Sequence, residues 1–108
     1  MARYLFIESR DPFTDRTVKE HFDLARDLAA RSHQVELYLV QDAVLLGRKA
    51  VAADGLDELA QAGVTILADD FSLLQRGVGE EEVRPQCKVS PISRVVEALE
   101  ADYKVIWN

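Results

Sequence analysis

The sequence predicts a single α/β domain, with a mostly parallel sheet of about five strands and helices on both of its faces. Two observations predict this fold. Strand-like apolar runs alternate with amphipathic helical patterns along the 108 residues, an order typical of parallel sheets. Several of these runs are continuously apolar, as in strands that are covered on both sides. Because no repeat or linker interrupts residues 1–108, we expect one three-layer domain over that range.

The first strand–helix–strand unit covers residues 3–40. Residues 3–8 contain the apolar run Tyr-Leu-Phe-Ile, which predicts a buried strand. Residues 15–31 predict a helix, and residues 34–40 predict a second strand that is parallel to the first. The helix is predicted from apolar residues at helical spacing, namely Val18, Phe22, Ala25, Leu28 and Ala29.

Two helical segments are expected before the next strand. Residues 41–53 predict a helix or a broken helix, because Gly47 interrupts the apolar pattern. The apolar cluster at 44–46 serves either the core or a contact with another subunit. Residues 55–62 predict a short amphipathic helix.

The central stretch, residues 63–78, predicts a buried strand that runs directly into a short helix. Val and Ile favour the extended state over residues 64–68. Asp69 or Asp70 is expected to cap the helix, because a carboxylate accepts hydrogen bonds from the unpaired N–H groups of the first turn. Gly77 is expected to end the helix in a left-handed conformation. Sites in open α/β sheets lie at such strand ends, so this junction is a candidate place for chemistry.

The last third of the chain predicts a loop, a helix and a closing strand. Residues 78–89 are expected to form a mobile loop, in which a short strand at 87–89 is an alternative. Ser90 is expected to cap the last helix, with Pro91 as its first helical residue. Residues 103–107 predict the closing strand. The apolar face of the helix is predicted from the spacing of Ile92, Val95, Val96 and Leu99.

The charge balance argues against several classes of function. With 13 basic and 19 acidic residues, the net charge is −6 and the pI is about 4.8. A general nucleic-acid binder needs a basic surface, and an anionic membrane repels an acidic protein. No apolar run is long enough to span a bilayer, and the first residues lack the pattern of a signal peptide. Together with a single cysteine, which forms no internal disulfide, these features predict a cytoplasmic protein.

The sequence contains no recognisable motif for a cofactor or a metal. The first strand is followed by a segment without Gly, so neither a phosphate loop nor a dinucleotide fingerprint is present. His21 and His33 lie twelve residues apart and Cys87 stands alone, so no cluster has metal-ligand spacing. We therefore expect no metal and no cofactor, and we expect His21 to be a surface residue of its helix.

Two candidate chemistries remain, one based on carboxylates and one on the thiol. Clustered carboxylates at strand ends bind Mg²⁺, but single ones also serve as helix caps. Cys87 lies close to Arg84 and Lys88, whose positive charges lower a thiol pKa and favour the nucleophilic thiolate. Such a thiol would accept sulfur as a persulfide, whereas an ordinary free cysteine explains the same residue. The acidic residues near predicted strand ends are Glu8, Asp11, Asp42, Asp69 and Asp70.

The whole pattern resembles the DsrE/DsrF-like family, which includes the Tus sulfur-relay subunits. The resemblance covers nearly the full chain. It rests on the strand at 3–8, the stretch at 63–78 with its Arg76-Gly77 pair, the helix at 90–99 and the closing residues 101–106.

The resemblance implies a sulfur chemistry and an oligomer. In the sulfur-carrying members, a cysteine stands at the end of the central strand, eight residues before the Gly of the Arg-Gly pair. Asp69 occupies that position here, and an Asp carries no persulfide. The family also contains subunits without the active cysteine, which contribute to assembly. Its members commonly form trimers or hexamers, so we expect a homo-oligomer or an assembly with related subunits.

Three functional hypotheses follow. The first is a non-catalytic binding or assembly subunit of sulfur metabolism, whose partners include a sulfur-donor or sulfur-acceptor protein. The second is a sulfurtransferase in which Cys87 is the catalytic persulfide carrier. The third is a metal-dependent enzyme with an acidic pocket. The predicted ligand-binding pocket consists of Asp69, Asp70, Ser72 and Arg76, together with Ser9, Asp11 and Asp42.

Overall fold

The computed structural model describes residues 1–11, 13–49 and 54–108, and it contains a five-stranded sheet in the order β4-β3-β2-β1-β5. Each pair of neighbouring strands is parallel. The predicted α/β fold is confirmed, with a sheet that is entirely parallel in the described part of the chain. The strands are β1 (Arg3–Glu8), β2 (Gln34–Leu39), β3 (Thr65–Asp69), β4 (Cys87–Ser90) and β5 (Lys104–Trp107).

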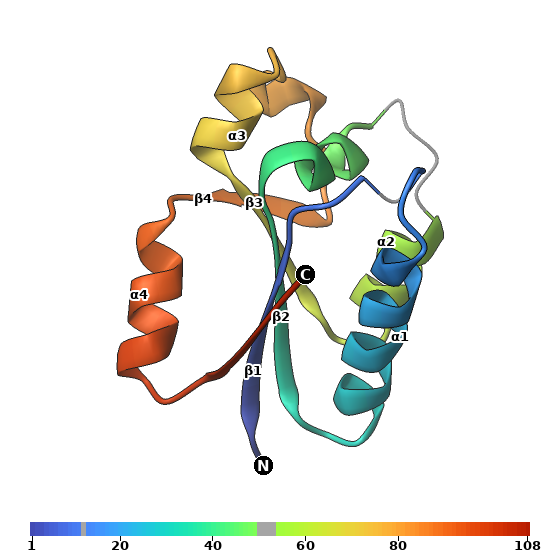
Figure 1. Cartoon of the computed structure of the whole chain (residues 1–108), viewed down its shortest axis with the longest axis vertical. Helices are drawn as coiled ribbons and strands as arrows, with labels where there is room; N and C mark the ends of the chain where they lie inside the picture. The colour runs from blue at the N-terminus through green and yellow to red at the C-terminus, as the bar shows by residue number, and fades with distance from the viewer. Residues whose placement is uncertain (12, 50–53) are drawn as a thin grey trace.

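Helices cover both faces of this sheet. The helices α1 (Thr17–Ala30) and α2 (Asp54–Gln61) lie on one face, and α4 (Ser93–Glu100) lies on the other (Figure 1). The short helix α3 (Asp70–Gln75) continues from β3, and the 3₁₀ helix η1 (Gln41–Gly47) follows β2. Since α3 and η1 contact each other, the carboxyl ends of β2 and β3 are bridged by these two short helices.

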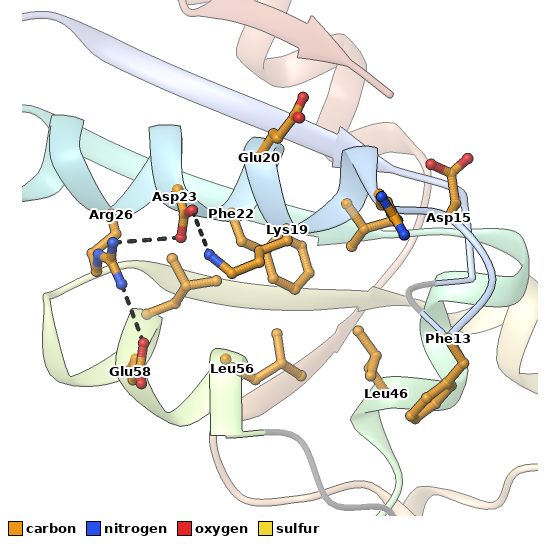
Figure 2. A pocket seen from close by; sticks show the side chains of 14 residues that line it. Phe13, Asp15, Lys19, Glu20, Phe22, Asp23, Arg26, Leu46, Leu56 and Glu58 are labelled. Atoms are coloured by element: carbon orange, nitrogen blue, oxygen red, sulfur yellow. Dashed lines mark hydrogen bonds and ion pairs between the residues drawn. The ribbon is translucent and has the colours of Figure 1, made fainter.

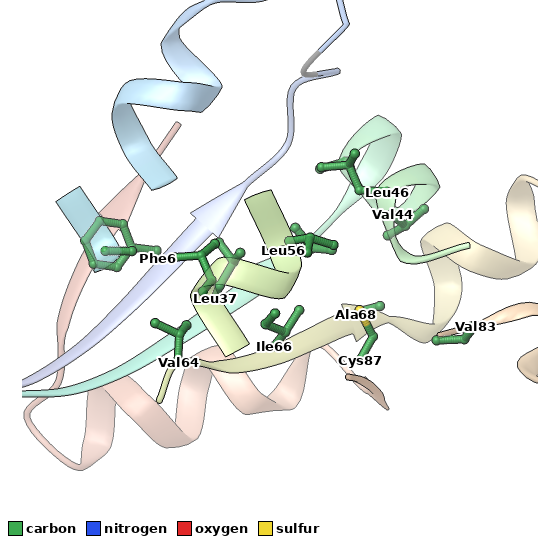
Figure 3. Packing of buried hydrophobic residues seen from close by; sticks show 14 of the residues in the cluster. Phe6, Leu37, Val44, Leu46, Leu56, Val64, Ile66, Ala68, Val83 and Cys87 are labelled. Carbon is green, nitrogen blue, oxygen red and sulfur yellow. The ribbon is translucent and has the colours of Figure 1, made fainter. Parts of the chain in front are cut away.

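Each face of the sheet has its own apolar core, because successive strand residues point to opposite sides. On the α1–α2 face, Phe6, Leu37 and Ile66 are almost completely buried (Figure 3). A second cluster lies under α4 and consists of Leu5, Ile7, Tyr38, Val40, Leu67 and Ala98. Tyr38 therefore carries a phenol hydroxyl into an otherwise apolar layer, where that hydroxyl needs a partner.

The predicted start of the last helix is wrong. Ser90 is the final residue of β4 and pairs with Asp69 of β3. The helix α4 begins at Ser93, after Ile92, and no side-chain hydrogen bond caps it. Pairing with β3 holds Ser90 in the strand, so that its hydroxyl does not cap the helix.

Part of the expected loop at 78–89 is regular structure. Glu80–Glu82 forms a 3₁₀ helix, η2, and the alternative of a short strand near Cys87 is confirmed by β4. An antiparallel bridge joins Val83 to Arg48. The backbone N–H of Arg84 donates to the carbonyl of Gly47, at 2.7 Å. These bonds attach the segment to the residues that follow η1.

The segment predicted as a helix or broken helix at 41–53 begins as η1 and turns extended at Arg48. Residues 50–53 lie outside the described residues. Of the apolar cluster at 44–46, Val44 and Leu46 are buried in the core on the α1–α2 face. Both side chains are therefore part of the hydrophobic core, as one of the two interpretations of this cluster predicted.

Candidate functional site

The centre of the candidate site is the carboxylate of Asp69, at the end of β3. Its Oδ2 accepts hydrogen bonds from the backbone N–H of Ser72 (3.0 Å) and from the Ser72 hydroxyl (2.6 Å). The first of these bonds makes Asp69 the N-cap of α3, as predicted. Gly77 follows α3 with φ of 67°, which confirms the predicted left-handed end.

Tyr38 of β2 supplies the third donor to Asp69. Its hydroxyl lies 3.0 Å from Asp69 Oδ1 and 3.0 Å from the carbonyl oxygen of Ser90. A phenol has one proton, and an ionised carboxylate is the stronger acceptor, so we assign the donated bond to Asp69. Burial raises the pKa of Tyr38 above its ordinary value, and the bond to Asp69 and the negative charge of that residue raise it further. Tyr38 is thus a neutral donor.

The Ser72 hydroxyl extends this network to the turn after β2. Its oxygen accepts a hydrogen bond of 2.9 Å from the backbone N–H of Gln41, the first residue of η1. Gln41 has φ of 51°, in the left-handed region that non-glycine residues rarely adopt. The bond therefore holds a strained turn in place. Asp69, which is only 6% exposed, connects β2, η1 and α3 through its partners.

Arg76 and Asp42 form a more exposed pair beside this network. Asp42 Oδ1 accepts from Arg76 Nη2 at 2.9 Å and from Nε at 3.2 Å. The guanidinium also donates to the backbone carbonyl of Ser72 through Nη1, at 3.4 Å. The charge of Arg76 is therefore paired, and an anionic ligand would compete with Asp42 for it.

The structure brings together some predicted pocket residues and separates others. Hydrogen bonds join Asp69 to Ser72, Ser72 to Arg76, and Arg76 to Asp42. Asp70 is exposed, and its Oδ1 accepts a hydrogen bond from the backbone N–H of Phe71 at 2.7 Å. The remaining two bond elsewhere: Ser9 donates to the carbonyl of Asn108, and Asp11 accepts from the N–H of Phe13. Sequence reasoning missed Tyr38 and Gln41, whose only signal was a tyrosine in an apolar strand and a polar residue directly after it.

Cys87 does not face this network. It pairs with Ile66, three residues before Asp69 on β3, and its side chain packs in the core on the α1–α2 face near Ala68 (Figure 3). Tyr38 packs on the α4 face, so the thiol and the Tyr38–Asp69 bond lie on opposite faces of the sheet. Burial raises the pKa of Cys87 to about 11. The positive charge of Arg84 opposes this increase, and the negative charge of Asp57 adds to it. Burial thus outweighs the expected effect of the basic neighbours.

His21 is not a surface residue, contrary to the prediction. It is 8% exposed, and its Nδ1 lies 3.1 Å from Oε1 of the fully buried Glu8. Among the described residues, no group of three or more His, Cys, Asp and Glu side chains is placed to hold a metal ion. None of the helices in the described ranges is long and apolar enough for a membrane span.

A cavity of about 920 Å³ lies between α1 and α2 (Figure 2). Its apolar lining includes Phe22, Leu46 and Leu56, and charged side chains surround this lining. The charges are largely paired, as Lys19 with Asp23 at 2.9 Å. None of the predicted pocket residues lines the cavity. It is therefore separate from the strand-end network.

These features define a protein of the α/β class with a strand-end helix cap at its candidate site. The chain matches the DsrE/DsrF-like family over residues 2–107 and belongs to that family.

Solved structures share this fold. The ychN protein of E. coli superposes with a TM-score of 0.89 at 15% identity, and both chains are covered completely. MTH1491 of Methanobacterium thermoautotrophicum, a protein of unknown function, has a TM-score of 0.85 at 20% identity, again over all of both chains. BT1422 of Bacteroides thetaiotaomicron, also of unknown function, has a TM-score of 0.77 at 18% identity over 97% of this chain and 94% of its own. No curated protein sequence matches the chain.

Replacing Asp69 by Ala should lower the free energy of unfolding much more than replacing its neighbour Asp70. Asp69→Ala removes a helix cap and leaves the buried Tyr38 hydroxyl with a weaker partner, for a combined loss of about 2–4 kcal/mol. Asp70→Ala removes an exposed carboxylate and should cost less than about 1 kcal/mol. Urea unfolding followed by circular dichroism measures both values. Equal losses for the two variants would contradict the structural role of Asp69.

Proposed function

We propose that this protein is a non-catalytic binding or assembly subunit of a cytoplasmic sulfur-relay system. The observation that carries the proposal is the state of Asp69. In the sulfur-carrying members of the family this position holds the cysteine, whereas here it holds a carboxylate whose two oxygens accept three hydrogen bonds from Tyr38 and Ser72. A carboxylate in this network caps a helix but offers no sulfur nucleophile.

Cys87 is a poor replacement for the missing nucleophile. A thiol with a pKa of about 11 is a thiolate in only about one molecule in 3,000 at pH 7.5. Its side chain is 7% exposed and packs in the core. A sulfur donor in solution therefore has little access to it. The sulfurtransferase hypothesis therefore has no supporting observation beyond the presence of the thiol.

The third hypothesis, a metal-dependent enzyme with an acidic pocket, has even less support. Asp42 is paired with Arg76, and Asp69 is occupied by Tyr38 and Ser72. A divalent cation at this end of the sheet would need two or more free carboxylates. Asp11 bonds within its own loop.

Exposed apolar side chains support an assembly role. On α4 and the residue before it, Ile92, Val96 and Leu99 are 60%, 55% and 58% exposed and follow the spacing of one helix face. On α3, Phe71 and Leu74 are 61% and 75% exposed. Clustered apolar surface of this kind marks a contact with another protein. We assign the α4 face, defined by Ile92, Val96 and Leu99, to a contact with a second copy or a related subunit in a trimer or hexamer.

Incubation with a persulfide donor at pH 7.5 should leave the intact mass of the native protein unchanged, because its only thiol is buried and protonated. Mass spectrometry is the measurement, with a known sulfur carrier loaded in parallel and the Cys87→Ser variant beside it. A gain of about 32 Da, one sulfur atom, in the parent and not in Cys87→Ser would contradict the proposal and establish Cys87 as a carrier.

Val96→Glu should dissociate the oligomer, because it places a charge in the middle of the α4 face. Size-exclusion chromatography with light scattering measures the mass in solution. Gln61→Glu is the matched control, since it adds the same charge at an exposed position on α2. We expect the parent and Gln61→Glu to be oligomers and Val96→Glu to be a monomer. A monomeric parent that binds no related subunit would overturn the assembly role, and an unchanged Val96→Glu oligomer would exclude the α4 face.

A further inference from the structure

A second polar cluster lies at the carboxyl end of β1, separate from the Asp69 network. Its centre is Glu8, which is completely buried. The carboxylate accepts hydrogen bonds from the backbone N–H of Arg10 at 3.0 Å and from Asn108 Nδ2 at 3.1 Å. His21 Nδ1 lies 3.1 Å from Oε1. We assign a ring proton to Nδ1, so that His21 donates to this carboxylate oxygen.

The other ring nitrogen of His21, Nε2, is buried and has no hydrogen-bond partner among residues 1–11, 13–49 and 54–108. In the tautomer that carries its proton on Nδ1, Nε2 is an acceptor. The ring is held in this orientation by Glu8 and by Phe6, whose ring centroid is 4.8 Å away. Buried polar atoms without partners are uncommon, and they point to a missing ligand or water.

His21 lines a recess of about 340 Å³ between α1 and the end of β5. Thr17, His21 and Leu24 contribute from one face of α1, and Trp107 and Asn108 close the other side. The recess is shallow and largely open, so it suits a small group that stays partly exposed. Leu24 and Trp107 line the recess and are 45% and 67% exposed, and access to the buried Nε2 requires these side chains to turn aside.

The polar groups of the recess favour a cation. Glu20 lines it and carries a negative charge, whereas no Lys or Arg is among its described lining residues. Glu20 also lines the cavity between α1 and α2, so its carboxylate lies between the two hollows. Nε2 accepts a hydrogen bond, and the exposed indole of Trp107 offers a π face, which attracts cations. Asn108 Nδ2, a donor of a lining residue, is already bonded to Glu8 and Thr17.

We propose that this recess binds an ammonium or guanidinium group on a short alkyl chain. The N–H of the cation donates to His21 Nε2, its charge lies near Glu20, and its alkyl chain packs on Leu24 and Trp107. The site is independent of the sulfur-relay role and uses none of the residues of the Asp69 network.

Three probes of equal size test the charge requirement: n-butylamine, n-butanol and butyrate. Each is titrated into ¹⁵N-labelled protein, and the Trp107 indole N–H and the backbone N–H of Leu24 are followed by NMR. We expect saturable shifts with n-butylamine and none with n-butanol or butyrate. A lysine blocked by acetylation and amidation is titrated in the same way and represents the lysine side chain of a partner protein. Comparison with n-butylamine separates a free amine from such a side chain as the ligand. Binding of either probe supports the cation site.

Two exposed variants locate the site without disturbing the buried Glu8–His21 pair. Glu20→Gln and Trp107→Leu should each weaken n-butylamine binding at least about 3-fold, as expected for one ion-pair or cation–π contact. Glu100→Gln, which makes the same change at an exposed position on α4, should leave binding unaltered. His21→Phe should abolish binding, with circular dichroism to confirm its fold. No saturable shift, equal shifts with n-butanol, or equal weakening by Glu100→Gln would overturn the proposal and leave water as the partner of Nε2.

Discussion

The hydrogen bonds to Asp69 are the interactions on which the carboxyl end of the sheet depends. This carboxylate lies at the end of β3 and receives donors from β2 and α3, and Ser72 passes the connection on to Gln41. A buried charge without partners costs several kcal/mol, so the arrangement of the neighbouring elements is selected by the need to supply those donors. The left-handed turn at Gln41 is held at the same place.

The same constraint is consistent with the proposed loss of sulfur chemistry in this chain. A thiolate and a carboxylate are both anions, and both suit the positive end of a helix dipole. An Asp at the strand end therefore preserves the capping interaction while it removes the nucleophile. The carboxylate also gives the buried hydroxyl of Tyr38 an acceptor. The position is thus structural in this chain, which accords with a binding or assembly role.

The fold could be predicted from the sequence because its signals are local. Apolar runs and helical spacing fix the strands and the long helix α1, and the cap at Asp69 and the turn at Gly77 follow from neighbouring residues. The errors concern residues whose environment depends on distant partners. Ser90 belongs to β4 because that strand pairs with β3, and His21 is buried because Glu8 is its partner. The high pKa of Cys87 similarly arises from burial in a core assembled from four strands, which its basic neighbours do not reveal.

A double-mutant cycle between Tyr38 and Asp69 tests the central claim most directly. The free energy of unfolding is measured for the parent, Tyr38→Phe, Asp69→Ala and the double variant. If Tyr38 donates to the Asp69 carboxylate, the two losses are non-additive, with a coupling energy of about 1–3 kcal/mol. Losses that add to within about 0.3 kcal/mol would show that the hydroxyl is bonded to the Ser90 carbonyl instead, and would contradict the role assigned to Asp69.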